Sequence, residues 1–206
     1  MVDTYDSSLS SGCELYYVFC QVSIDSEKIH ILDDIILDSR RGLAHIDKGA
    51  KSSALLFLNS LPPETIIESG SHVPMQPFPG YPWAGRSLDE IYEYFKEIIG
   101  DGFAEHNFAV VDKRTLEDGT VLLCSDSDGS LAKVRADGYS SLHTMVPDEM
   151  GTKPLRDYGS NFVVTEEYIM ADDLEYLAGV QAKVARGEAL KDIEKRLTGL
   201  ENGTAD

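Results

Sequence analysis

Residues 87–125 read SLDEIYEYFKEIIGDGFAEHNFAVVDKRTLEDGTVLLCS, and this stretch decides the fold class. Its first part predicts a helix, because Ser87 and Glu90 have the spacing of a capping box. Apolar residues then recur at helical intervals until Gly100, and glycine commonly follows a helix end. The stretch therefore begins with one well-capped helix.

The second part of the same stretch predicts a pair of strands. The runs NFAVVD at residues 107–112 and TVLLCS at residues 120–125 are short and apolar. The Asp118-Gly119 dipeptide between them is typical of a tight turn. A central helix followed by neighbouring paired strands favours an α+β fold with a small, mainly antiparallel sheet.

Outside this stretch the patterns are shorter. Buried strands are predicted at residues 14–24 and 54–58, where aromatic and branched side chains dominate. Residues 28–38 fit both a helix and a strand. Residues 137–161 are expected to be rich in loops, and an edge strand is expected at residues 162–165.

The expected organisation is a single compact α+β domain at residues 13–186. A flexible, serine-rich lead occupies residues 1–12, and a helical tail with a frayed end occupies residues 187–206. Four apolar side chains of the tail repeat on one stripe of the predicted helix and form a candidate oligomerisation face, namely Leu190, Ile193, Leu197 and Leu200.

Charge is the outlier of the composition, since 36 Asp and Glu against 18 Lys and Arg give a formal net charge of -18. Most of this excess lies in residues 87–182, which hold 20 acidic and 7 basic side chains. Phosphate backbones and anionic membranes repel such a chain, so nucleic-acid and membrane binding are disfavoured. The charge favours a basic protein as partner.

Cysteine usage and the N-terminus both indicate a cytoplasmic protein. The three cysteines, Cys13, Cys20 and Cys124, cannot pair completely within one chain. The first residues lack the basic start and apolar core of a secretory signal, and no apolar run approaches the length of a membrane span.

The candidate catalytic residues are Cys124 as nucleophile, His106 or His143 as its base, and Asp112 as an orienting carboxylate. The alternative is that Cys124, which follows three apolar residues, is a buried and inert thiol. Histidine and cysteine spacing does not match a metal site, and no glycine-rich phosphate loop is present. Neither a metal nor another cofactor is predicted.

The segment HVPMQPFPGYPWAGR at residues 72–86 contains four prolines and three candidate ligand-binding aromatic residues, Phe78, Tyr81 and Trp83. The PxxP spacing of residues 79–82 matches a polyproline ligand. The alternative is that Trp83 packs into the core and the prolines position the following helix.

The succession SLDEIYEYF, HNFAVVDKRTL, TVLLC and SNFVVTEEYI is similar to a domain family of bacteria and fungi that has no assigned function. The resemblance covers about residues 55–174 and rests on the hydrophobic pattern and on FAVVDKRTL. It implies a compact α+β domain and supplies no catalytic residues. The long N-terminal section, the proline loop and the helical tail depart from the family pattern.

Together these features favour a cytoplasmic interaction module whose acidic middle binds a basic partner protein, as inhibitors and antitoxins do. One alternative is a small enzyme with a site around Cys124, His106 and His143. The other is a self-associating protein that uses its C-terminal helix.

Overall fold

The computed structural model describes residues 14–46, 53–58, 70–78, 80–100, 102–127, 129–159, 162–172, 174–175 and 178. The chain divides into two units, Met1–Glu166 and Glu167–Asp206. The first unit contains a six-stranded sheet with helices, which confirms the predicted α+β class. The described residues of the second unit are helical.

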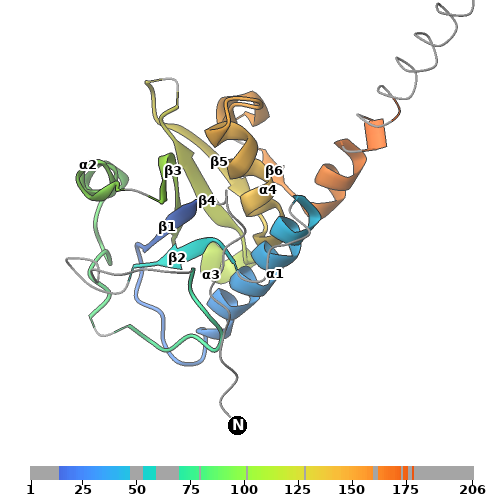
Figure 1. Ribbon diagram of the computed structural model, residues 1–206. Helices are drawn as coiled ribbons and strands as arrows, with labels where there is room; N and C mark the ends of the chain where they lie inside the picture. The colour runs from blue at the N-terminus through green and yellow to red at the C-terminus, as the bar shows by residue number, and fades with distance from the viewer. Residues whose placement is uncertain are drawn as a thin grey trace, which may run out of the picture. The chain divides into compact units, whose positions relative to one another are not determined.

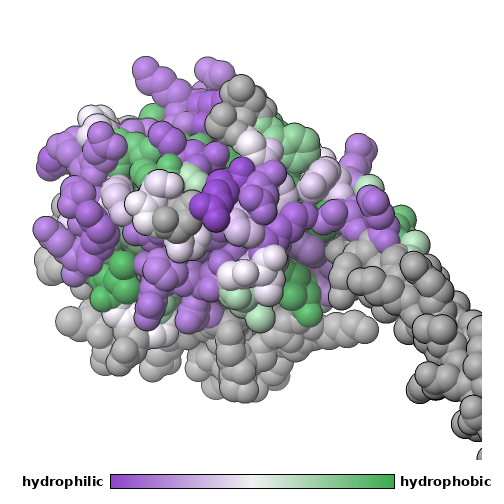
Figure 2. Space-filling view, turned by 90° about the horizontal axis from the view of Figure 1, so that it is seen from above, coloured by the Kyte–Doolittle hydropathy of each residue, from purple (hydrophilic) through white to green (hydrophobic). Residues whose placement is uncertain are grey.

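Several sequence predictions lie outside the described residues. They are the lead at residues 1–12, the tail at residues 187–206 and the stripe of Leu190, Ile193, Leu197 and Leu200. No helix in the described parts of the chain combines the length and apolarity needed to cross a bilayer. On the face seen in Figure 2, hydrophilic side chains cover most of the described surface, and hydrophobic ones form small separate patches.

The sheet has the strand order β2-β1-β3-β4-β5-β6 (Figure 1). Its strands are β1 (Leu15–Cys20), β2 (Leu55–Phe57), β3 (Phe103–Val111), β4 (Val121–Ser125), β5 (Ala132–Ala136) and β6 (Val163–Val164). β1 is parallel to β2 and β3, β4 is antiparallel to β3 and β5, and β6 is parallel to β5. The sheet is mixed, so the prediction of a mainly antiparallel sheet is wrong.

The parallel part of the sheet arises because helices join its strands. Residues 28–38, whose pattern is ambiguous, lie largely in helix α1 (His30–Ile46) between β1 and β2. A helical crossover returns the chain to the same end of the sheet, so the next strand runs parallel to the first. Helix α2 (Leu88–Ile98) lies between β2 and β3, and its predicted capping box is present.

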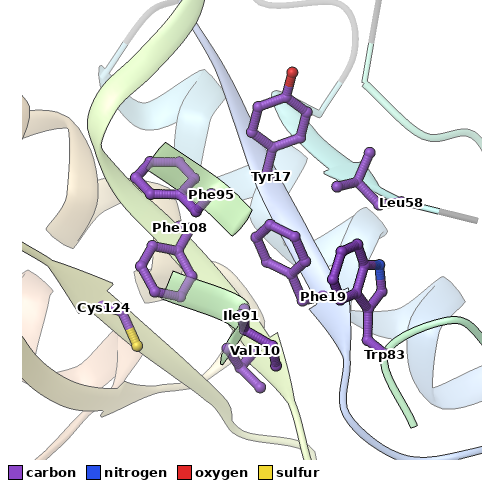
Figure 3. Close-up of a cluster of buried hydrophobic side chains, with 9 residues drawn as sticks. All are labelled: Tyr17, Phe19, Leu58, Trp83, Ile91, Phe95, Phe108, Val110 and Cys124. Atoms are coloured by element: carbon purple, nitrogen blue, oxygen red, sulfur yellow. The ribbon is translucent and has the colours of Figure 1, made fainter. Parts of the chain in front are cut away.

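The helices lie on the two faces of the sheet. α2 covers one face, while α1 and α4 (Gly138–Glu149) pack together on the other (Figure 1). A short helix α3 (Thr115–Asp118) lies between β3 and β4, and a 3-10 helix η1 (Leu155–Tyr158) precedes β6. Beneath α2, the rings of Phe95 and Phe108 lie 4.7 Å apart in an aromatic core (Figure 3).

The expectation of loops at residues 137–161 is wrong, because α4 begins there. Asp137 caps this helix by accepting the backbone N–H of Ser140 at 2.7 Å. The helix is rich in Gly, Ser and Thr, which are poor helix formers. Glycines on both helices allow a close approach, because a Cβ on Gly42 of α1 would lie 1.9 Å from the carbonyl oxygen of Tyr139, and one on Gly138 of α4 would lie 2.9 Å from the Cβ of Asp38. Packing against α1, rather than local propensity, therefore accounts for α4.

Candidate functional site

A group of carboxylates lies at the end of the sheet where β1 and β3 begin and β4 ends. Helix α4 also ends there. We call this group the acidic rim, and its members are Glu14, Glu105, Asp126, Asp148 and Glu149. These residues come from segments that are far apart in the sequence, and the fold brings them together.

Glu149 holds the end of α4 against the start of β3. Its carboxylate accepts the backbone N–H of Glu105 at 2.8 Å and the side-chain Nδ2 of Asn107 at 2.6 Å. The negative end of the helix dipole disfavours a carboxylate at this position. The hydrogen-bond donors of β3 offset that repulsion and tie the helix to the sheet.

Asp148 is the buried member of the rim, with 2% of its surface exposed. It accepts hydrogen bonds from Asn107 Nδ2 at 2.9 Å, from Ser125 Oγ at 2.6 Å and from the backbone N–H of Leu155. A buried carboxylate is stable only where such donors replace water. Asp148 therefore acts as a structural anchor between α4, β3 and β4.

Asn107 shows that acceptors outnumber donors in this region. Both neighbours of its side chain are carboxylates, so the Nδ2 group must face them. Its Oδ1 atom is buried and has no hydrogen-bond partner among the described residues. An unpaired buried acceptor costs about 1–3 kcal/mol. The two carboxylates therefore set the orientation of the Asn107 amide.

His106 lies on the solvent side of the rim, with 44% of its side chain exposed. Its Nδ1 atom is 3.0 Å from Asp126 Oδ1, and Tyr92 of α2 donates its hydroxyl to Asp126 Oδ2 at 2.8 Å. Partial burial lowers the pKa of His106. The hydrogen bond to Asp126 and the charges of Glu149, Asp126 and Glu105 outweigh this effect and raise the pKa above 6.5.

Like charges also crowd Glu14 at the beginning of β1. Burial and then the negative charges of Glu149 and Glu105 raise the pKa of Glu14 above 4.5, with a partly offsetting effect of His106. Within the described parts of the chain, no Lys or Arg forms an ion pair with a rim carboxylate. The negative charge of the rim is therefore largely uncompensated.

The structure does not bring the four catalytic candidates together. His106 lies near the beginning of β3, and Asp112 follows the end of the same strand. His143 belongs to α4, on the face of the sheet opposite α2, and its ring centroid lies 5.5 Å from that of His45. Of the four, only His106 lies beside the acidic rim, where it contacts Asp126.

Cys124 lies in the core between the sheet and α2, beside Phe95 and Phe108 (Figure 3). It is fully buried, and this burial raises the pKa of its thiol to about 12. A thiol that remains protonated and has no access to solvent cannot serve as a nucleophile for an external substrate. The structure thus places Cys124 as the small core residue that was the alternative interpretation.

The aromatic residues of the proline loop are also buried. Phe78, Tyr81 and Trp83 are 8%, 7% and 4% exposed. Trp83 packs edge-on against Phe19 with ring centroids 5.0 Å apart, and the Tyr81 hydroxyl donates to the carbonyl of Ile24 at 2.7 Å. Their rings position the loop before α2 and present little surface to a ligand.

Sequence reasoning missed the rim carboxylates because none of their segments is unusual by itself. Adjacent acids such as Asp148-Glu149 are common at protein surfaces, and only the position of Asp148 beneath this end of the sheet distinguishes it. Among the described residues, no group of three or more His, Cys, Asp or Glu is arranged to hold a metal ion.

Comparisons with protein-family models, curated proteins and solved structures found no match to this chain. The resemblance to the bacterial and fungal domain family therefore stays a prediction.

Proposed function

We propose that the protein is a cytoplasmic binding module that docks a cationic segment of a partner protein on the acidic rim. The observation that supports this most directly is the crowding of Glu14, Glu105 and Glu149 without a Lys or Arg counter-charge among the described residues. An inhibitor or antitoxin that blocks a basic partner has this kind of surface.

The exposed and buried members of the rim have different parts in this proposal. Glu14 and Glu105 are exposed, and neither carboxylate is engaged by another described side chain. A lysine or arginine of the partner placed between them would relieve their mutual repulsion and form charge-assisted hydrogen bonds. Asp148 and Glu149 hold the backbone that positions them.

The surface next to the rim continues its negative character. The hydrogen bond from Tyr92 to Asp126 joins the rim to α2, which exposes Asp89, Glu93 and Glu97. The net charge of -18 would also accelerate encounter with a cationic partner.

Titration with a fluorescent oligolysine peptide tests the proposal. We expect saturable binding that weakens as salt is added, because the attraction is screened. The double variant Glu14→Gln/Glu105→Gln should bind about fivefold more weakly, since each exposed charge pair contributes about 0.5 kcal/mol. Fluorescence anisotropy at low and high salt measures both effects.

A matched control removes two acids elsewhere. Asp34 on α1 and Glu117 on α3 are exposed and have no side-chain partner among the described residues. The double variant Asp34→Asn/Glu117→Gln changes the net charge equally and should retain the affinity of the wild type. Equal weakening of both double variants would show a diffuse charge effect and reject the rim as the docking site.

A further inference from the structure

The opposite end of the sheet has a topology that opens a crevice between two strands. β1 and β3 are parallel neighbours, but the chain leaves β1 towards β2 on one side and leaves β3 towards β4 on the other. In open α/β sheets, ligands bind outside the carboxyl ends of parallel strands. The end of β1 and β3 is therefore the position to inspect for a ligand.

An open surface depression of about 480 Å³ lies at this position. Its lining comes from the residues that directly follow β1 and β3 and from the segment that leads into α2. We call it the cationic pocket, and its polar lining consists of Gln21, Gly85, Arg86, Asp112, Lys113 and Arg114.

Hydrogen bonds at the strand ends hold this lining in place. The backbone N–H of Gln21 donates to the carbonyl of Val111 at 2.8 Å, and the N–H of Gly85 donates to the carbonyl of Gln21 at 3.0 Å. The side-chain Nε2 of Gln21 donates to the carbonyl of Arg86 at 2.7 Å. The segment before α2 is thus fastened to β1, and the backbone of Arg86 is fixed beside the depression.

The single carboxylate of the lining, Asp112, forms an ion pair with a buried arginine. Arg135, which is 9% exposed, forms an ion pair with Asp112 Oδ2 and also donates to the carbonyl of Thr120 at 3.1 Å. The other oxygen of Asp112 accepts the backbone N–H of Thr115 at 3.0 Å. Because Asp112 pairs with Arg135, it forms no ion pair with the other charged lining residues, Arg86, Lys113 and Arg114.

Those remaining charges are accessible to a ligand. Arg86 pairs with Glu90 at 3.1 Å and Arg114 pairs with Asp118 at 2.8 Å, but both pairs are exposed and contribute little. Lys113 forms no ion pair with any described residue. An incoming anion can therefore replace these surface contacts at small expense.

We propose that the cationic pocket binds a small organic dianion, either a phosphate ester or a dicarboxylate. The lining contains two arginines and one lysine, whose side chains bind such anions through charge-assisted hydrogen bonds. A depression of this volume accommodates a metabolite-sized molecule. The pocket shares no residue with the acidic rim, so each proposal can fail without the other.

An NMR titration of the full-length, nitrogen-15-labelled protein tests the proposal with inorganic phosphate, succinate and, as a monoanion, acetate. We expect saturable shifts at residues 21–22, 85–86 and 112–114 with at least one dianion, and weaker binding of acetate. Saturation by phosphate alone identifies the phosphate-ester class, saturation by succinate alone the dicarboxylates, and saturation by both a general dianion site. Unsaturable or widely scattered shifts with both dianions would overturn the proposal.

Charge variants distinguish the pocket from general attraction. Lys113→Gln and Arg114→Gln should each weaken binding about three- to tenfold, the effect of losing one strong contact to an anion. Lys133→Gln makes the same charge change outside the pocket, at an exposed position of β5 that lies opposite Cys124 of β4 in the sheet. This variant should leave the affinity unchanged. An equal loss in Lys133→Gln would reject a specific site, and thermal unfolding verifies that each variant is folded.

Discussion

At one end of the sheet the buried carboxylate Asp148 is held by neutral donors, whereas at the other end the partly buried carboxylate Asp112 is held by an arginine. Asp148 accepts from Asn107, Ser125 and a backbone N–H, so the acidic rim keeps its negative charge. Asp112 is paired with Arg135, so it does not pair with Arg86, Lys113 or Arg114 of the cationic pocket. The kind of partner given to a carboxylate thus decides which sign a region presents.

The largest test of this comparison is the removal of Asp148. In Asp148→Ala, the buried donors of Asn107, Ser125 and Leu155 lose their acceptor, and we expect a loss of about 3–4 kcal/mol in the free energy of unfolding. Equilibrium urea denaturation measures it, with Asp34→Ala as an exposed control. A loss as small as that of the control would show that the rim is not anchored through this residue.

The second test removes the counter-charge of the opposite end. Arg135→Met leaves Asp112 with only its hydrogen bonds to Thr115, and we expect a loss of about 2 kcal/mol because the carboxylate is then unpaired. Adding Asp112→Asn should restore part of that stability, as a double-mutant cycle of urea denaturation would measure. Fully additive losses would mean that the two side chains are not coupled.

The third test uses the pH dependence of the rim. The pKa of His106 is raised by folding, so its stabilising effect is complete below the unfolded pKa and is lost as pH rises through the folded pKa. His106→Gln should therefore lose about 0.5 kcal/mol relative to the wild type near about pH 5.5, and nothing near about pH 9, since solvent screens this exposed pair. Denaturation at both pH values measures the difference.

An NMR titration of the His106 ring provides an independent check on the same charge effect. A pKa at or below 6.5 would contradict the view that the rim carboxylates act on this imidazole.

The smallest expected effect concerns the surface cations of the pocket. Arg114→Gln removes only an exposed ion pair with Asp118, so the free energy of unfolding should change by less than about 0.5 kcal/mol. Thermal and urea unfolding test this expectation. A large loss in the free energy of unfolding would show that Arg114 supports the fold. Lys113→Gln would then be the variant that tests the effect of the pocket charges on anion binding.

Local elements of the fold could be predicted because their signals lie close together in the chain. The capping box joins Ser87 and Glu90 through hydrogen bonds of 2.8 and 3.2 Å across three positions. Helix α4 was missed because it depends on contact with α1, a partner that its own segment does not reveal. The parallel pairing of β1 and β3 likewise depends on crossovers that residue patterns do not specify.

The two ends of the sheet show which features of this protein follow from its sequence and which follow from its tertiary structure. The amino-acid sequence by itself determined the net charge, the excess of acids in residues 87–182, the capped helix and the buried apolar runs, because these are sums or short-range patterns. Only the tertiary structure decided that the charge of Glu149 acts on Glu14 and that Lys113 and Arg86 line the same depression. Charges interact according to their separation in space, and the helical crossovers of the fold set that separation.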